Sequence, residues 1–155
     1  MDGGARAEDF LAAISFWEMH AGKRLFKVGD EWRGPALPFT GSPDHLDTIL
    51  ANAIVFEGPW TFEENIAGEA ILRVTGGTIT GAVILLDPQT DVCTGLCEGR
   101  EDSTSLRRLI AHELGHFLGL GHVQDSTNIM VPAILPGGEL EDRTVDGAAL
   151  HLLVD

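Results

Sequence analysis

Residues 112–122 (HELGHFLGLGH) constrain the fold of this chain more than any other segment. Residues four apart on an α-helix project from one face, so His112 and His116 can bind a single cation if the segment is helical. Gly119 adopts the left-handed backbone conformation at little cost, which ends the helix and lets the chain turn back. His122 can then return as a third ligand. The segment therefore predicts a helix that ends beside a metal site.

The residue types indicate which metal binds and what the site does. Three imidazoles suit zinc, and three protein ligands leave one coordination position open, which is typical of a catalytic site. Glu113 neighbours His112 without lying in the plane of the ligands, and it can reach a water on the metal. The alternative is a buried amphipathic helix whose histidines make ordinary hydrogen bonds. Met130, eight residues after His122, adds a further position to the pattern. Each additional required residue makes a chance occurrence of the pattern about twentyfold rarer, which disfavours this alternative.

The histidine segment, followed by residues 128–132 (NIMVP), resembles the metzincin clan of zinc endopeptidases. The spacing of Met130 and Pro132 after the last histidine is most similar to the matrixin-like branch. The resemblance is strongest over residues 104–132, weaker over 70–90 and 139–153. Some metzincins add a tyrosine to the zinc ligands, but this chain contains no tyrosine.

The resemblance implies a zinc-dependent endopeptidase that hydrolyses peptide bonds of proteins or peptides. One catalytic Zn²⁺ would be bound by His112, His116 and His122, and Glu113 would be the general base that activates a zinc-bound water. Met130 would be the Met-turn residue, which lies beneath the metal without binding it. Two alternatives stay open: a catalytically silent module that binds zinc and captures peptides, and a latent proenzyme.

The fold that the resemblance implies is a small α+β catalytic domain. It has a twisted mixed β-sheet, a long first helix, a zinc-binding active-site helix, a Met-turn and a C-terminal helix. A chain of 155 residues suits one domain with one core. We expect a single domain over residues 1–155, with an upper part over about 1–119 and a lower part over about 120–155.

Local patterns predict most of the elements. Phe10, Leu11, Ile14 and Trp17 recur at helical spacing and predict a helix over residues 8–20. Gly76-Gly77 between two aliphatic runs predicts a hairpin. Ser103 or Thr104 is expected to cap the helix with the histidines. The remaining expectations are a strand over 24–28, a short helix or turn over 42–53 leading into a strand, strands over 70–75 and 79–87, and a closing helix over 145–153.

Two segments are candidates for substrate binding. The resemblance implies that the strand over 79–87 is the edge strand above the cleft, where an extended substrate adds as a further strand. The alternative is an ordinary core strand. The segment after Met130 would form the outer wall of the pocket for the first side chain beyond the scissile bond, and its apolar residues favour an apolar side chain. The candidate residues are Ala82, Val83, Ile84, Val131, Pro132 and Ala133.

Cys93 and Cys97 are separated by three residues. In an oxidising compartment they could form a disulfide that shapes a local turn, because so small a loop gains little by chain entropy. Free thiols, or a thiol that blocks zinc, are the alternatives. A structural zinc site isn't predicted, since a second cysteine pair is lacking.

Acidic residues gather in the same region and could supply oxygen ligands for Ca²⁺. Their spacing matches no calcium motif, and acidic loops are usually just solvated, so Ca²⁺ is the weaker expectation. The residues in question are Asp87, Asp91, Glu98, Glu101 and Asp102.

The formal net charge of −14 bears on partners. Phosphate repels an acidic surface, so nucleic-acid binding is not expected, whereas a cationic peptide would be favoured on approach. No apolar run is long enough to span a bilayer. The partner we expect is a peptide or protein substrate, and the expected oligomeric state is a monomer. The first residues are not a signal peptide. We expect a secreted or extracytoplasmic protein whose leader has been removed, with a cytoplasmic protein as the alternative.

Overall fold

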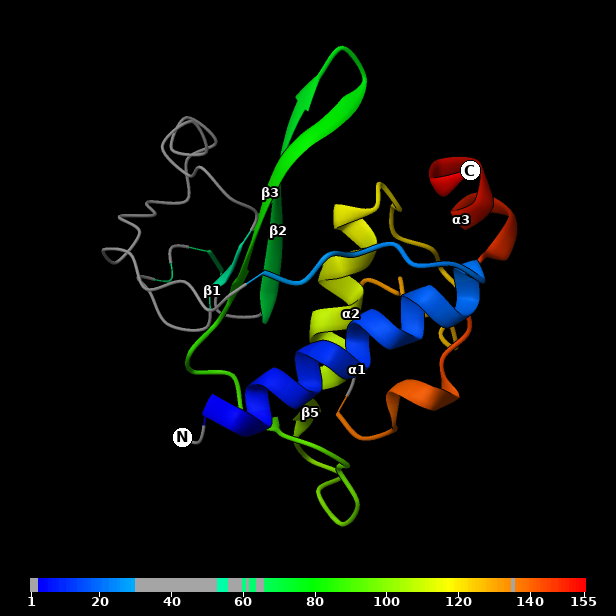
Figure 1. Ribbon diagram of the computed structural model, residues 1–155. Helices are drawn as coiled ribbons and strands as arrows, with labels where there is room; N and C mark the ends of the chain where they lie inside the picture. Colours follow the sequence, from blue (N-terminus) through cyan, green and yellow to red (C-terminus); the bar gives the residue numbers. More distant parts are fainter. Residues whose placement is uncertain (1–2, 30–52, 56–59, 61, 64–65, 135) are drawn as a thin grey trace. The chain divides into compact units, whose positions relative to one another are not determined.

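The computed structural model describes residues 3–29, 53–55, 60, 62–63, 66–134 and 136–155. These residues form an α+β structure with three α-helices and two small sheets. The elements, in chain order, are α1 (Gly3–Ala21), β1 (Ala53–Val55), β2 (Gly68–Thr75), β3 (Thr78–Leu86), β4 (Val92–Cys93), β5 (Thr104–Ser105), α2 (Leu106–Phe117), the 3₁₀ turn η2 (Leu140–Asp142) and α3 (Gly147–Val154). Figure 1 shows them coloured along the sequence.

The described residues fall into two compact units. The first comprises those within Met1–Lys27 and Asp91–Asp155, and the second those within Val28–Thr90. The single domain expected over residues 1–155 stays a prediction. None of the described helices is both long and apolar enough to cross a bilayer.

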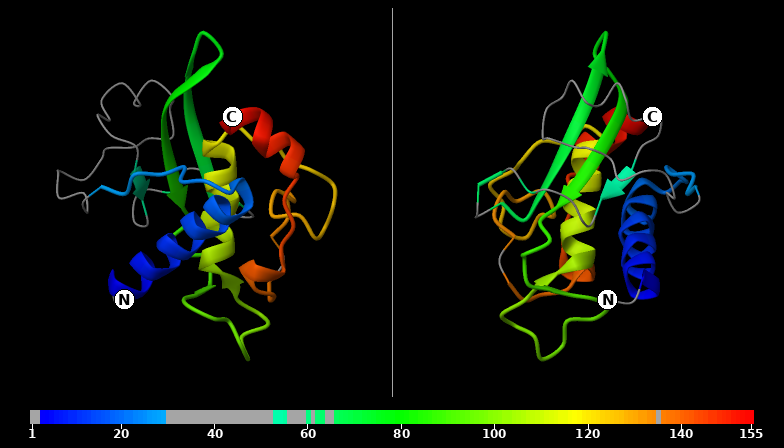
Figure 2. Two further views of the ribbon diagram at one scale, coloured as in Figure 1. Left: turned by 45° about the vertical axis from the view of Figure 1, so that its right-hand side comes forward. Right: turned by 90° about the vertical axis from the view of Figure 1, so that its left-hand side faces the viewer.

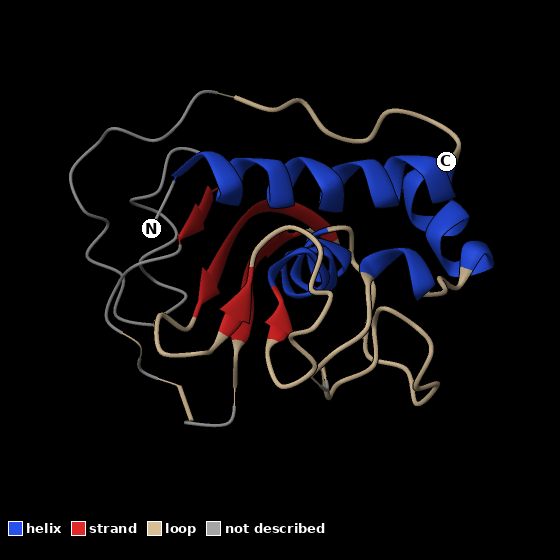
Figure 3. Cartoon of the chain, turned by 90° about the horizontal axis from the view of Figure 1, so that it is seen from below, coloured by secondary structure: helices blue, strands red, loops and turns tan. Residues whose placement is uncertain are grey.

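The first unit is built on the packing of α1 against α2. Figure 3 looks along α2, and α1 runs across it. The helix predicted over residues 8–20 is confirmed, and Ile14 and Trp17 are buried as expected. Leu11 was expected on the same face, but it is 49% exposed. The buried face includes Asp9 and Ala13, and Leu11 lies two residues from each, which is about 200° around a helix.

The strand predicted over residues 24–28 is wrong. The helix ends at Ala21, followed by Gly22 with a φ of 67°. The backbone N–H groups of Leu25 and Phe26 then donate to one oxygen of the Glu18 carboxylate, at 2.9 and 3.1 Å. Because a side chain takes these two donors, they are not available to a neighbouring strand.

The helix that carries the histidines, α2, begins after a Ser105 cap. The Ser105 hydroxyl accepts the N–H of Arg108 at 3.4 Å. The prediction of Ser103 or Thr104 as cap is wrong, since the Ser103 hydroxyl donates to the Asp91 carboxylate at 2.8 Å and Thr104 pairs with β4. The predicted helix end is confirmed: α2 stops at Phe117, and Gly119 has a φ of 100°.

The carboxyl-terminal part of the first unit packs against these two helices. The predicted closing helix is confirmed as α3, and the Asp146 carboxylate caps it by accepting the N–H of Ala149 at 3.0 Å. Leu140 of η2 and Leu150 of α3 are buried. Both elements contact α1, and η2 also contacts α2. The described part of this unit therefore has one core, which the histidine-bearing helix helps to build.

The second unit contains a mixed three-stranded sheet in the order β1-β3-β2. The predicted hairpin is confirmed, and Figure 2 shows β2 and β3 as its two long arms. Gly76 and Gly77 both have positive φ, 57° and 81°, as a two-residue type I′ turn requires. The short helix or turn predicted over residues 42–53 lies, apart from Ala53, outside the described residues.

The expected edge position of Ala82, Val83 and Ile84 is wrong. These residues belong to β3, the central strand of the described sheet. Val83 and Ile84 pair with Ala53 and Ile54 of β1 on one side and with Ile71 and Ala70 of β2 on the other. All three residues are also buried. Val83 and Ile84 are thus paired on both sides within the described sheet, and Ala82 is paired with Leu72 of β2. The expected role of the three residues in substrate binding stays a prediction.

We predict that Ser105→Ala lowers the free energy of unfolding by about 1 kcal/mol, because it removes the N-cap of α2. Ser15→Ala on the exposed side of α1 is the matched control and should change it by only a few tenths. Denaturant unfolding followed by circular dichroism measures both. Equal effects of the two substitutions would contradict the assignment of the cap.

Candidate metal centre

The side chains of His112, His116 and His122 converge, as the sequence predicted for a metal site. Their candidate ligand atoms all lie within 4.8 Å of one another. The Nε2 atom of His122 is 3.2 Å from Nε2 of His112 and 3.1 Å from Nε2 of His116. Within the part of the chain that the structure describes, this is the one group of three or more side chains arranged to hold a metal ion.

The spacing of the nitrogen atoms fits zinc. A tetrahedral zinc ion with bonds of about 2.0–2.1 Å holds its ligand atoms about 3.3 Å apart. The two separations from His122 Nε2, 3.2 and 3.1 Å, are close to this value. The residues present therefore suit a zinc ion bound through three imidazole nitrogens.

Two backbone carbonyls orient the helix histidines. Nδ1 of His112 lies 2.8 Å from the Ile129 carbonyl oxygen, and Nδ1 of His116 lies 2.8 Å from the Leu120 carbonyl oxygen. A carbonyl can only accept, so each Nδ1 carries the hydrogen and each Nε2 keeps its lone pair. The Nε2 lone pairs of His112 and His116 both face Nε2 of His122, an arrangement that suits a bound cation. This is the arrangement by which outer hydrogen bonds prepare histidine for a metal.

The segment that supplies the Ile129 carbonyl is itself held in place. The Ile129 N–H donates to the Thr144 carbonyl at 2.9 Å. The Asn128 side chain, which is buried, accepts the N–H of Met130 at 2.9 Å. The N–H of Val123 donates to the Met130 carbonyl at 3.0 Å, which ties the turn carrying the third histidine to the same segment.

Burial differs along the site and sets its electrostatics. His112 is 4% exposed, His116 is partly buried and His122 is exposed. Burial lowers the pKa of His112 from 6.5 to about 4; the bond to the Ile129 carbonyl opposes the shift, and the other two histidines add to it. Burial likewise lowers the pKa of His116. Both groups are therefore neutral near pH 7, the form that binds a metal.

Glu113 and Met130 lie beside the histidines. Glu113 follows His112 on α2 and is 3% exposed. Met130 is also 3% exposed, and its side chain packs against Gly115 of α2, where a Cβ atom would come within 2.2 Å of its sulfur. The Met-turn role expected for Met130 stays a prediction, although its packing against the helix with the histidines is compatible with it.

Cys93 and Cys97 are joined by a disulfide in the structure, with Cα atoms 5.7 Å apart. The loop between them is anchored at its middle and at its second cysteine. The Gly95 N–H donates to both carboxylate oxygens of the buried Asp9, at 2.9 and 3.1 Å, and the Cys97 N–H donates to Glu139 at 2.7 Å. The disulfide thus closes a turn that α1 and the segment before η2 both hold.

The acidic residues considered for Ca²⁺ form no group of three that could hold an ion among the described residues. Asp87 accepts hydrogen bonds from the Gln89 N–H and the Thr90 hydroxyl, so it shapes its own turn. Asp91 accepts from Ser103 and Arg100. The other three, Glu98, Glu101 and Asp102, are exposed.

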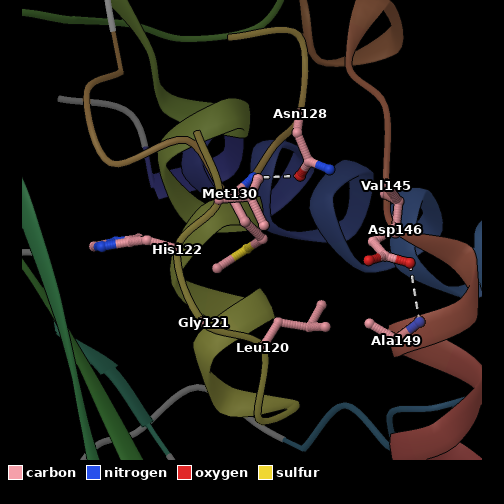
Figure 4. Close-up of a pocket in the computed structure, with 9 residues that line it drawn as sticks. Leu120, Gly121, His122, Asn128, Met130, Val145, Asp146 and Ala149 are labelled. Atoms are coloured by element: carbon pink, nitrogen blue, oxygen red, sulfur yellow. Dashed lines mark hydrogen bonds between the residues drawn. The ribbon is translucent and has the colours of Figure 1, made fainter. Parts of the chain in front are cut away.

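A pocket of about 190 Å³ lies between the turn after α2 and the start of α3 (Figure 4). His122 contributes to its lining, but Figure 4 shows the imidazole directed away from Val145 and Asp146 on the far wall. Val131, Pro132 and Ala133 do not line this pocket, and Pro132 and Ala133 are exposed. Their expected role as a wall of the substrate pocket stays a prediction. The residues that do line it are Leu120, Gly121, His122, Val123, Asn128, Met130, Val145, Asp146 and Ala149.

Sequence reasoning missed the α3 part of this pocket. Val145 just before α3 and Ala149 within it are ordinary apolar residues, and no local pattern distinguishes them. Three further histidines, His20, His45 and His151, have no motif around them, so the sequence predicts surface or packing residues. His20 packs edge-on against the Phe16 ring, and His151 Nδ1 lies 3.3 Å from the Asp155 carboxylate. His45 lies outside the described residues.

Comparison with known proteins points to one family. Residues 13–149 match the family described as Matrixin. A curated protein, metalloendoproteinase 1-MMP of Arabidopsis thaliana, is 39% identical over 49 residues. That match covers 32% of this chain and 14% of the relative, so the chain corresponds to only a small part of the longer protein.

The lowered pKa of His112 predicts a pH dependence of stability. Its pKa is below 6.5 in the folded state, so the unfolded chain binds the proton more tightly, and stability falls as the pH falls from 6.5 toward 4. For the metal-free protein this group alone removes about 3 kcal/mol by pH 4, at 1.36 kcal/mol per pKa unit. Denaturant unfolding across this pH range measures the loss. His112→Asn is the control, because asparagine keeps an N–H donor for the Ile129 carbonyl but does not titrate. Its unfolding free energy should fall less over the same pH range. An equal loss in both proteins would rule out this origin.

Proposed function

The chain belongs to the matrixin family, and from this premise we propose that it is a zinc-dependent endopeptidase acting on proteins or peptides. The observation that carries the proposal is the convergence of three imidazoles whose Nε2 atoms are 3.1–3.2 Å apart at His122. The open fourth position that such a ligand set leaves is what a catalytic zinc site needs.

The proposed ligands are His112, His116 and His122. The bonds to the Ile129 and Leu120 carbonyls hold the first two rings so that their Nε2 atoms face the third. Zinc, when bound there, supplies Lewis acidity to the scissile carbonyl and to a water molecule. The exposed His122 lies on the side from which a substrate can approach, because the other two rings are more buried.

Glu113 is the proposed general base. It follows a ligand on the same helix, and its position in a buried environment favours proton transfer to and from a carboxylate. In the proposed reaction its carboxylate takes a proton from the attacking water and delivers it to the leaving amine. Breaking of the C–N bond then yields a carboxylate and an amine.

We further propose that the protein acts outside the cytoplasm. Matrixins are typically extracellular, and the Cys93–Cys97 disulfide suits an oxidising compartment. A cytoplasmic protein is the alternative. The oligomeric state proposed is a monomer.

We predict that Glu113→Gln retains zinc but lowers the rate of peptide cleavage by about 100- to 10,000-fold, the usual contribution of general acid–base catalysis. The substitution keeps the shape of the side chain and removes its basicity. Cleavage of a fluorogenic peptide library and zinc content measure the two effects, and Glu98→Gln in an exposed loop is the control. Cleavage at the parental rate by Glu113→Gln would exclude the proposed role.

We predict that one zinc ion binds per chain and that His116→Ala weakens its binding by more than about 100-fold, above the effect of losing an outer partner. Competition with a chromophoric chelator measures this affinity. His151→Ala is the control, because His151 is exposed and pairs with Asp155 instead. A chelator should abolish cleavage and added zinc should restore it. A parent protein that binds zinc but cleaves no peptide would favour the alternative, a silent module that captures peptides.

A further inference from the structure

Gly115 leaves a notch in the surface of α2 beside the two helix histidines. It lies three residues after His112 and one before His116. A Cβ atom at this position would come within 2.2 Å of Met130 Sδ and within 2.9 Å of Trp17 Cζ2. Two side chains from distant parts of the chain therefore fill one small space against α2 (Figure 4 shows Met130 over the helix).

Trp17 is fixed in this notch by more than packing. Its side chain is fully buried, and its indole N–H donates to the Ala111 carbonyl at 2.8 Å. A buried indole N–H needs such a partner, and the bond fixes both the position and the tilt of the ring. Ala111 directly precedes His112, so α1 is joined to α2 at the turn that carries the first ligand (Figure 1).

The second occupant, Met130, is linked to the same ligand from the other side. It follows Ile129, whose carbonyl accepts from His112 Nδ1 at 2.8 Å. Its own N–H is held by Asn128. The width that the Trp17 ring leaves in the notch thus limits where the Met130 side chain, and with it the Ile129 carbonyl, can lie.

We propose that Trp17 is a positioning residue of the metal centre, which shares the Gly115 notch with Met130 and thereby orients His112 toward the metal through the Ile129 carbonyl. The inference rests on the proposed zinc site for its effect on metal affinity. Its structural part, the orientation of His112, holds in the metal-free protein as well. The competing explanation is that Trp17 only packs the core and stabilises the fold.

The first experiment uses Trp17→Phe, which removes the N–H donor and replaces the indole by a smaller aromatic ring. We expect zinc affinity, measured by chelator competition, to fall about tenfold, as for other outer partners of a ligand. In the metal-free protein we expect the His112 Nδ1 proton, followed by NMR, to exchange about tenfold faster because its bond to Ile129 is less well held. The visible spectrum of the Co²⁺-loaded protein should also change.

Ile14→Ala is the matched control, since Ile14 is a buried residue on the same face of α1. It should lower the thermal midpoint without changing zinc affinity, the Co²⁺ spectrum or the exchange of the His112 proton. If Trp17→Phe behaves like Ile14→Ala, with a lower midpoint and unchanged metal and proton readouts, Trp17 is a packing residue only and the inference is overturned.

A second pair of variants tests the shared notch directly and does not depend on the folding of Trp17→Phe. Gly115→Ala should weaken zinc binding because the new Cβ displaces Met130 and Trp17. Adding Met130→Ala removes the closer of the two clashes, the one with Met130 Sδ. We expect the double variant to bind zinc more tightly than the product of the two single effects predicts. Strictly additive effects would overturn the inference.

These results separate the inference from the proposed function. If the parent binds zinc but cleaves no peptide, the proposed function fails, and zinc affinities of the variants still decide the inference. If the parent binds no zinc, the exchange of the His112 proton decides it. If the parent cleaves peptides and the variants match it in every metal and proton readout, the inference alone fails.

Discussion

The hydrogen bond between His112 Nδ1 and the Ile129 carbonyl joins the two parts of the first unit that matter most for its chemistry. On one side is α2, and on the other the segment Asn128–Met130, which Thr144 and Val123 hold in turn. The bond is buried, so neither group could find water if it broke. It also leaves the lone pair of His112 on Nε2, facing the other histidines, and so makes the site suitable for a cation.

Around this bond, the packing of the first unit converges on α2. Trp17 of α1 donates to Ala111 on the helix, and the buried Asp9 accepts from Arg107 Nε at 2.7 Å near the helix start. Asp9 also holds the disulfide loop through the Gly95 N–H. The helix is therefore held near its start by a carboxylate and at its middle by an indole, and His122, beyond its end, is exposed.

Local signals in the sequence were sufficient where the chemistry depends on a single element. The HELGH spacing, the Gly119 helix end and the Gly76-Gly77 turn each depend on backbone conformations that a few neighbouring residues determine. Predictions failed where a distant group competed for a backbone donor or partner. Glu18 takes the N–H groups of Leu25 and Phe26, Ser103 is engaged by Asp91, and β3 is paired on both sides. None of these partners is visible in the segment itself.

The sequence by itself predicted that His112, His116 and His122 come together, because helical periodicity aligns the first two and a glycine turn can bring back the third. It also determined the family resemblance. Only the tertiary structure decided which nitrogen of His112 points inward, since that depends on the Ile129 carbonyl, which packs against the ring from a later segment. It also decided that Trp17 and Met130 meet at Gly115, a contact between residues about a hundred positions apart, which no local periodicity encodes.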